Sequence, residues 1–328
     1  MVRDLTNTKV SLDGVVDWGN SPHPPAPDAA VEAEVLERFV AAGVAPNTKK
    51  ALVAGWDAWE KWATARGSHV FPARGWDVAV WLCWLRERGN AASTVRLRRW
   101  AVAAKHKDAG LPDPTRERVV VDALKGIGRV DAANTWQAAP LRGTDFSKII
   151  ETTNVTKRAG CRDLAMLAVM RDGMLRGSEV CAVRWCDITV RNDGLGVLLI
   201  RRSKTDQEGV GWRRLLSEVT MKFVLDWQAW RRVELSDGVI DEQERMFGLK
   251  NYAGVTARLE LRGRYAKLHG LTSHSVRVGA AQDLAEAGMS LPQIMQIGRW
   301  KSSTMVARYI EHLVEKGSGS AGVLSALV

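Results

Sequence analysis

Two residues in the stretch SHSVRVGAAQDLAEAG, His274 and Arg277, have the type and spacing to bind an anionic group. The stretch is predicted to be helical, and residues three apart lie on one face of a helix. One permanently cationic donor and one donor that can become cationic therefore point the same way. Taken alone, the pair is as typical of ordinary surface polarity as of a binding site.

Other short segments also contain residues with possible chemistry. A phenol titrates near about 10 in water, so a nucleophilic tyrosine needs nearby cations and a base. Each candidate also has a structural interpretation: an isolated arginine is usually an ion-pair partner, a hairpin lysine is usually solvated, and a tryptophan is usually core. The candidates are Arg176 and Glu179 in GMLRGSEV, Lys204 in RRSKT, Trp300 in GRW and Tyr309 in VARYI.

Together these segments resemble the catalytic signature of the tyrosine recombinases, or phage integrases. That signature is His-x-x-Arg, a His or Trp about two dozen residues later, and a nucleophilic Tyr nine beyond that, and Tyr309 stands nine after Trp300. The resemblance covers roughly residues 30–328, with gaps around 233–255 where this chain looks shorter. Several matched positions in order and at family spacing are a specific signal, whereas His-x-x-Arg alone is not.

The resemblance implies a role in DNA strand transfer for each matched residue. Arg176 and Arg277 would grip the scissile phosphate, because guanidinium groups are fixed, bidentate donors to phosphate oxygens. Lys204 would protonate the departing 5′-oxygen. Tyr309 would be the nucleophile, leaving a covalent 3′-phosphotyrosine and a free 5′-hydroxyl.

Three further matched residues would support this chemistry. His274 would hydrogen-bond a non-bridging oxygen or help to move the proton of the nucleophile, and Trp300 would donate its indole N–H to the phosphate. Glu179 resembles a family acidic residue that orients active-site groups. Because the covalent link stores the phosphodiester energy, the resemblance implies no ATP, metal or other cofactor, and the sequence has no GxxxxGK[ST] motif.

The charge distribution favours a polyanionic partner, which the resemblance identifies as double-stranded DNA. Residues 1–40 carry 3 basic and 7 acidic residues, residues 41–140 carry 16 and 9, and residues 141–328 carry 28 and 21. Two basic regions therefore follow an acidic arm. The sequence has no apolar run of transmembrane length and no secretory-type N-terminus, so we expect no membrane partner and a cytoplasmic, nucleoid-associated protein.

Helical periodicity predicts a mainly α fold in two domains. An acidic, flexible arm covers residues 1–27, and a helical bundle, which the resemblance identifies as a core-binding DNA clamp, covers 28–132. A linker, 133–141, leads to a mainly helical catalytic domain, 142–328, with a small three-stranded antiparallel sheet. Six tryptophans lie between positions 56 and 84, and we predict that they form the core of the bundle.

Basic side chains on three predicted helices are candidates for DNA contact. An α-helix fits the major groove, and arginine suits guanine and phosphate, although a solvated helix face explains such side chains equally well. Residues 253–269 resemble the catalytic-domain helix that enters the groove. The candidates are Lys49, Lys50, Arg96, Arg98, Arg99, Lys105, Arg258 and Arg262.

The four cysteines form no CxxC pair, and no histidine lies at zinc-like spacing from them. We predict that Cys83, Cys161, Cys181 and Cys186 are reduced, buried, small hydrophobic residues rather than metal ligands.

The resemblance also implies an assembly: a homodimer on each inverted-repeat site and a homotetramer in the synapse, with a Holliday junction between cleavage steps. The C-terminal GSGSAGVLSALV would be a tethered helix that docks on a neighbouring subunit, or else a disordered tail. Two alternatives stay open. Residues 280–310 also resemble a helix-turn-helix, which would suit a non-catalytic regulator, and a type IB topoisomerase or telomere resolvase would use the same tyrosine.

Overall fold

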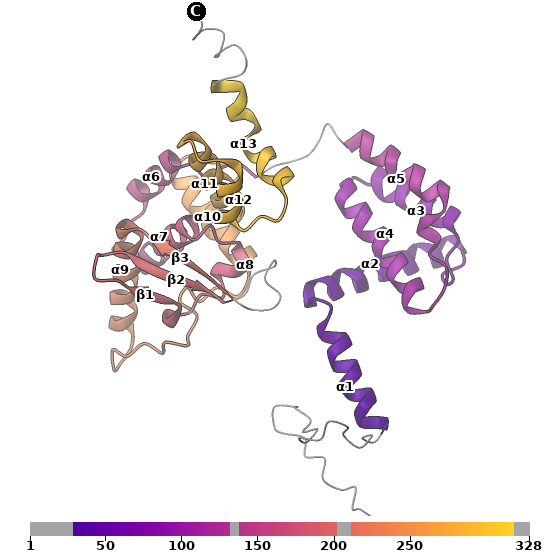
Figure 1. The fold of residues 1–328 in the computed structure, drawn as a ribbon, viewed down its shortest axis with the longest axis horizontal. Helices are drawn as coiled ribbons and strands as arrows, with labels where there is room; N and C mark the ends of the chain where they lie inside the picture. The colour runs from indigo at the N-terminus through magenta and orange to yellow at the C-terminus, as the bar shows by residue number, and fades with distance from the viewer. Residues whose placement is uncertain (1–28, 132–137, 202–210, 318–328) are drawn as a thin grey trace, which may run out of the picture. The chain divides into compact units, whose positions relative to one another are not determined.

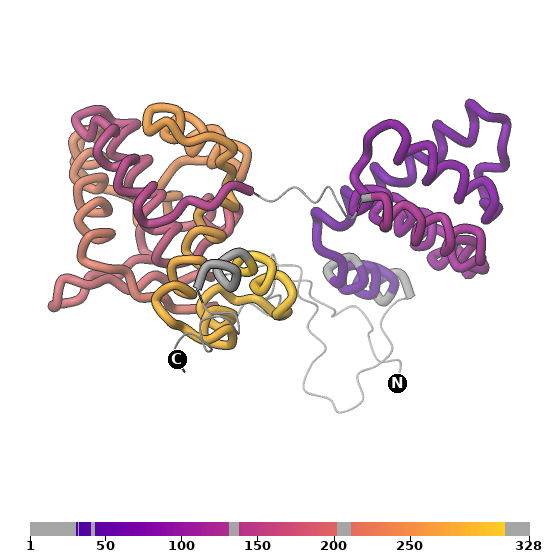
Figure 2. The backbone as a smooth tube through the Cα atoms, turned by 90° about the horizontal axis from the view of Figure 1, so that it is seen from above, coloured from indigo at the N-terminus to yellow at the C-terminus, as the bar shows by residue number. Residues whose placement is uncertain are grey.

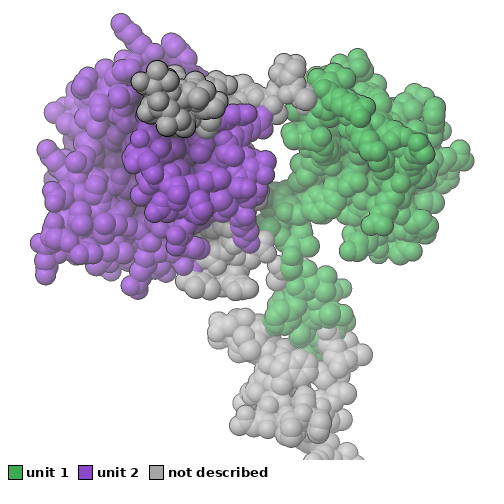
Figure 3. Space-filling model, turned by 45° about the horizontal axis from the view of Figure 1, so that its top comes forward, with its two compact units in different colours: residues 1–135 green, residues 136–328 purple. Residues whose placement is uncertain are grey.

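The computed structural model describes residues 29–131, 138–201 and 211–317, and the chain divides into two compact units, residues 1–135 and 136–328 (Figures 1 and 3). Both units are mainly helical, and the second contains a three-stranded antiparallel sheet, which confirms the predicted fold class. The division falls inside the predicted linker. Leu141, at the end of that predicted linker, is instead buried in the core of the second unit.

The first unit is a helical bundle. Pro46 stands at the first turn of α2, where its missing N–H costs nothing, and Gly67 ends the helix with a left-handed φ of 70°. Helix α2 packs on α4, and α3 packs on α5. The elements are α1 (Ala29–Ala42), α2 (Pro46–Arg66), α3 (Gly75–Glu87), α4 (Ala92–Asp108), a 3₁₀ turn η1 (Pro114–Arg116) and α5 (Arg118–Asp131).

Tryptophans form the centre of this bundle, as predicted for most of them. Trp59 and Trp81 are fully buried, with ring centroids 5.3 Å apart, and two more pack beside them. The prediction is wrong for Trp76 and Trp84, which are 65% and 41% exposed. Helical spacing alone does not say which side of a tryptophan-rich helix faces the core, so the exposure of these two residues could not be predicted.

The second unit is built around α7, on which every residue from Leu164 to Met170 is buried. Helices α9 and α11 and strand β3 pack on it. The elements are α6 (Gly143–Thr152), α7 (Arg158–Asp172), α8 (Gly177–Val180), η3 (Trp185–Asp187), β1 (Ile188–Val190), β2 (Gly196–Ile200), β3 (Trp212–Leu216), α9 (Glu218–Glu234), α10 (Tyr252–Tyr265), α11 (Ser275–Glu286), α12 (Leu291–Gly298) and α13 (Ser303–Gly317).

The sheet has the order β1-β2-β3, with both pairs antiparallel. Leu198 on the central strand lies opposite Ile188 on one side and Arg214 on the other. Alternate residues of β2 are buried, which gives the sheet one face toward the core. Lys204 belongs to residues 202–210 between β2 and β3, outside the described residues.

The cysteines are only partly buried. Cys161 and Cys181 are buried, and burial raises the pKa of the Cys161 thiol to about 11, so that thiol stays protonated. The prediction of burial is wrong for Cys83, which is exposed on α3, whereas Cys186 is half-buried. All four are free thiols.

A buried carboxylate on α7 fixes α10. Asp163 is completely buried and accepts hydrogen bonds from Nε of Arg258 at 2.9 Å and from Nε of Arg262 at 2.8 Å. Arg262 is 7% exposed and points into the protein, so the structure gives no support to its predicted contact with DNA. Arg258 keeps a side chain that is 25% exposed, and its contact with DNA stays a prediction.

Replacing Asp163 with Ala is expected to lower the free energy of unfolding by about 3–5 kcal/mol, because it leaves buried guanidinium charge without a partner. Urea denaturation of the full chain measures this change. The control is Asp145→Ala, which removes only the pair with Lys148 on α6 and is expected to cost about 1 kcal/mol or less. Equal losses for the two variants would contradict a structural role for Asp163.

Candidate active site

Helices α11, α12 and α13 pack on one another, and α11 also packs on α7, at one end of the second unit (Figures 1 and 2). His274 is the N-cap residue of α11, and Arg277 lies in its first turn. The chain before α6 lies against this helix, with Leu141 N donating to the Ser275 carbonyl at 3.0 Å. Gly279 permits this approach, because a Cβ there would stand 1.9 Å from the Leu141 carbonyl oxygen.

Arg277 is fully buried beneath Trp300. Its Nη2 donates to the Gly298 carbonyl at 2.6 Å, its Nη1 donates to the Met174 carbonyl, and its guanidinium carbon lies 4.5 Å from the centroid of the Trp300 ring. Met174 has a φ of 44°, and this turn directs its carbonyl toward Arg277. Burial lowers the pKa of Arg277 to about 9, and the charges of nearby Arg176 and Arg299 add to this shift. A bound anion would relieve that repulsion.

Glu179 holds Arg176 at the start of α8. Arg176 Nη1 donates to Oε1 of Glu179 at 2.7 Å, and the Arg176 backbone N–H donates to Oε2 at 3.0 Å. The side chain of Arg176 is 21% exposed, whereas that of Glu179 is 3% exposed. This geometry supports the predicted orienting role of Glu179.

Tyr309 projects from α13 toward His274 and Trp300. Its hydroxyl lies 2.7 Å from Nε2 of His274, and its ring centroid lies 5.9 Å from that of Trp300. Gln282 on α11 donates to the Tyr309 carbonyl at 2.9 Å, which fixes α13 to α11. Tyr309 is 3% exposed.

Burial and, to a smaller extent, the nearby charges decide whether the shared proton lies on Tyr309 or on His274. Burial lowers the pKa of His274 to about 4, helped by the charges of Arg277 and Arg176. Burial raises the pKa of the Tyr309 phenol, although Arg277, Arg308 and Arg176 oppose the increase. At neutral pH the phenol is therefore protonated and donates to a neutral imidazole, which makes His274 a candidate base for Tyr309.

Six predicted site residues are thus brought together, and a further one was missed by sequence reasoning. The missed residue is Arg299, which is 4% exposed and donates to Oε2 of Glu179 at 2.7 Å. Its only sequence signal is an arginine directly before Trp300. The residues brought together are Arg176, Glu179, His274, Arg277, Trp300 and Tyr309, while Lys204 lies outside the described residues.

The candidate DNA-contact residues of the first unit lie on α2 and α4. Lys49, Lys50, Arg96 and Lys105 are exposed, whereas Arg98 and Arg99 are half-buried. Arg98 donates to the Ala54 carbonyl, so part of its guanidinium binds α2. Contact of all six with DNA stays a prediction.

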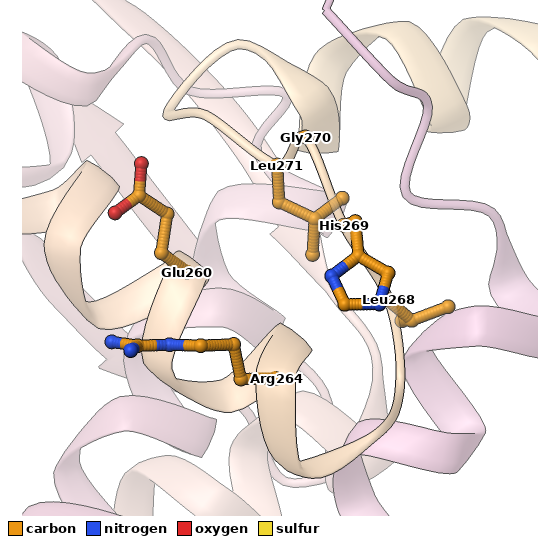
Figure 4. Close-up of a pocket in the computed structure, with 6 residues that line it drawn as sticks. All are labelled: Glu260, Arg264, Leu268, His269, Gly270 and Leu271. Atoms are coloured by element: carbon orange, nitrogen blue, oxygen red, sulfur yellow. The ribbon is translucent and has the colours of Figure 1, made fainter.

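An open pocket of about 310 Å³ lies at the end of α10, and none of the clustered residues lines it (Figure 4). Its lining residues are Glu260, Arg264, Leu268, His269, Gly270 and Leu271. Within residues 29–131, 138–201 and 211–317, no three His, Cys, Asp or Glu residues form a group that could hold a metal ion. In the same ranges, no helix combines the length and apolar character needed to span a bilayer.

The sequence profile of the phage integrase family matches residues 140–316, which include the whole cluster. This chain belongs to the phage integrase family. It is 29% identical over 294 residues to recombinase cre of Escherichia phage P1, covering 81% of this chain and 84% of that protein. It is 25% identical over 294 residues to an integrase/recombinase xerD homolog of Selenomonas ruminantium, covering 81% and 82%.

Solved structures share the fold of this family member. The integrase of transposon Tn1549 in complex with transposon right end DNA matches with a TM-score of 0.60 at 16% identity, covering 90% of this chain and 96% of that one. The XerH recombinase bound to a palindromic difH substrate matches with a TM-score of 0.57 at 14% identity, covering 75% and 72%. Family membership confirms the predicted class of enzyme, a site-specific tyrosine recombinase.

The depressed pKa of His274 predicts a loss of stability in acid. Its folded pKa of about 4 lies below the unfolded value of 6.5, so its contribution is present above pH 6.5 and is lost as the pH falls toward 4. Between pH 7 and pH 4.5, we expect the free energy of unfolding to fall by about 1–2 kcal/mol more for wild type than for His274→Asn. This range allows for the partial exposure of His274. Urea unfolding of both proteins at the two pH values measures this. Equal losses of unfolding free energy in the two proteins would show that the fold does not hold His274 neutral.

Proposed function

We propose that this recombinase cuts and rejoins DNA at a specific site through a covalent 3′-phosphotyrosine formed by Tyr309. The observation that carries the proposal is the 2.7 Å contact between the Tyr309 hydroxyl and His274 Nε2, beside buried arginines. A phenol needs a base and neighbouring cations to attack phosphorus, and this cluster supplies both.

In the proposed step the phenol oxygen of Tyr309 attacks the scissile phosphorus while its proton passes to Nε2 of His274. The bond from phosphorus to the 5′-oxygen breaks, and Lys204 protonates the departing oxygen. Attack by the 5′-hydroxyl of another strand reverses these events, frees Tyr309 and joins the new strand. Each step exchanges one phosphoester for another, so the reaction needs no ATP, and the arginines take the charge-stabilising role that a metal ion would otherwise have.

Arg176 and Arg277 stabilise the charge on the non-bridging oxygens, and Trp300 donates its indole N–H to the same phosphate. Arg277 stays protonated at neutral pH, because its pKa of about 9 is still above 7. Two of its nitrogens already bind carbonyl oxygens, which fixes the guanidinium before substrate binds. Because Tyr309 is 3% exposed, the phosphate reaches it only after a local opening around α13.

The proposed DNA partner is a duplex with an inverted-repeat site, bound by a homodimer on each site and a homotetramer in the synapse. Two such cleavage rounds pass through a Holliday junction. Exposed lysines and arginines on α2 and α4 would bind backbone phosphates, and the C-terminal segment, which lies outside the described residues, would dock on a neighbouring subunit. Two solved relatives support this proposal: XerH is bound to a palindromic substrate, and a lambda integrase dimer is bound to a core site.

The alternative of a non-catalytic regulator is weakened by the same cluster, because DNA binding alone requires no tyrosine hydrogen-bonded to a histidine beside buried arginines. A topoisomerase-like or telomere-resolving enzyme would use the same step, and the two activities differ in their products. Strand exchange between two duplexes supports the recombinase proposal, whereas relaxation of one supercoiled circle or closure of a hairpin end supports the alternative.

The covalent step is tested with a nicked suicide duplex whose inverted repeat has been selected by binding from a random pool. Wild type is expected to form a covalent protein–DNA species on a denaturing gel, and Tyr309→Phe is expected to form none, since it lacks the nucleophilic oxygen. Tyr265→Phe is the matched control, because Tyr265 is 59% exposed on α10 and should leave the species unchanged. Equal amounts in wild type and Tyr309→Phe would refute the proposal, and specific binding without any covalent species would favour the regulator.

DNA affinity is expected to fall steeply with salt, because each phosphate contact releases counterions. Arg96→Gln and Lys105→Gln should each reduce the slope of log K against log salt by about 1 if the residue contacts one phosphate. Fluorescence anisotropy of a labelled duplex over a salt series measures the slope. Affinity that does not depend on salt would contradict binding through the basic helices.

A further inference from the structure

Arg299 is a buried cation to which the proposed chemistry assigns no role. It ends α12 as the C-cap residue, with the left-handed backbone angles φ 57° and ψ 45°, and it is 4% exposed. A left-handed conformation is unfavourable for a residue with a side chain, and burial is unfavourable for a charge. A glycine at this position would avoid both costs, so the presence of an arginine points to a use for its guanidinium.

The contacts of Arg299 link it to both arginines of the phosphate site. Its Nη2 donates to Oε2 of Glu179 at 2.7 Å and to the Met174 carbonyl at 3.1 Å. The other carboxylate oxygen of Glu179 accepts from Arg176 at 2.7 Å, and the Met174 carbonyl also accepts from Arg277. Arg299 therefore shares one acceptor with each of these arginines.

These contacts fix the carboxylate between two cations. Glu179 is the third residue of the four-residue helix α8, and its Oε2 accepts the Arg176 backbone N–H at 3.0 Å. Arg299 adds a charged donor to the same oxygen, which holds the carboxylate in the orientation in which Oε1 faces the Arg176 guanidinium. Nε and Nη1 of Arg299 have no partner within the described ranges, so its known hydrogen bonds serve this orientation and the Met174 turn.

We propose that Arg299 is a positioning residue of the recombinase site, which fixes Glu179 and the Met174 carbonyl so that Arg176 and Arg277 meet the scissile phosphate together. The inference rests on the proposed function. A positioning role for Arg299 differs from a purely structural role, because it predicts that an Arg299 variant has a slower chemical step but an unchanged affinity for DNA.

The test compares single-turnover cleavage of the nicked suicide duplex at saturating protein with the affinity for the same DNA. Arg299→Gly relieves the left-handed backbone, so the variant should fold, as monitored by circular dichroism. We expect cleavage to slow by about tenfold to a hundredfold, the effect of losing a hydrogen bond to a charged group. DNA affinity should stay within about twofold, and Arg299→Lys should recover part of the rate, since its ammonium restores the charge beside Glu179.

The matched control is Lys222→Gln. Lys222 is an exposed cation on α9, so the substitution removes one positive charge outside the cluster and outside residues 253–269. Cleavage by this variant should match wild type. A wild-type rate for Arg299→Gly would overturn the inference and leave the proposed function intact, whereas failure of wild type to form the covalent species would overturn the proposed function itself.

A double-mutant cycle keeps the inference testable should the glycine variant fail to fold. Arg299→Gln retains most of the side-chain volume and is combined with Glu179→Gln. If Arg299 acts partly through Glu179, the double variant should lose less than the sum of the two single losses, because residues that act as a unit are not additive. Fully additive losses would overturn the inference.

Discussion

Several like charges must be held close together inside an apolar unit, and the rest of this structure is arranged around that constraint. Arg176, Arg277 and Arg299 converge on one carboxylate, Glu179, and on the carbonyl oxygens of Met174 and Gly298. Buried charge is costly unless it is paired and hydrogen-bonded. The backbone supplies the missing acceptors where it turns sharply, at Met174 and at the end of α12.

Burial, modified by the same cations, sets the protonation of the nucleophile and its neighbour. Arginine charges and burial together keep His274 neutral, so its Nε2 is free to accept a proton, while burial keeps the Tyr309 phenol protonated. The site therefore contains a protonated nucleophile already hydrogen-bonded to a neutral acceptor. A phosphate that enters among the arginines would bring the negative charge that the cluster lacks, which would stabilise the cations and lower the cost of their proximity.

Arginines in this protein serve two different purposes that look alike in the sequence. Around Asp163 they attach α10 to the core helix α7, and around Glu179 they form a site with spare capacity for an anion. Arginines outnumber the carboxylate at both places, but at Asp163 Arg258 keeps 25% of its side chain exposed to solvent. At Glu179 the neighbouring Arg277 and Arg299 are almost completely buried, and this excess of unsolvated positive charge suits a site for an anionic substrate.

The sequence alone determined the fold class, the helical character of residues 29–131 and six of the residues that gather at the site. It could do so because hydrophobic periodicity is local and the catalytic signature is a fixed order of residues along the chain. Only the tertiary structure decided which arginines face inward. Arg262 meets its carboxylate across 99 residues and Arg299 meets Glu179 across 120, and the outward faces of Trp76 and Trp84 likewise depend on which helices pack beside α3. Burial and charge pairing arise from such distant contacts, which no local pattern specifies.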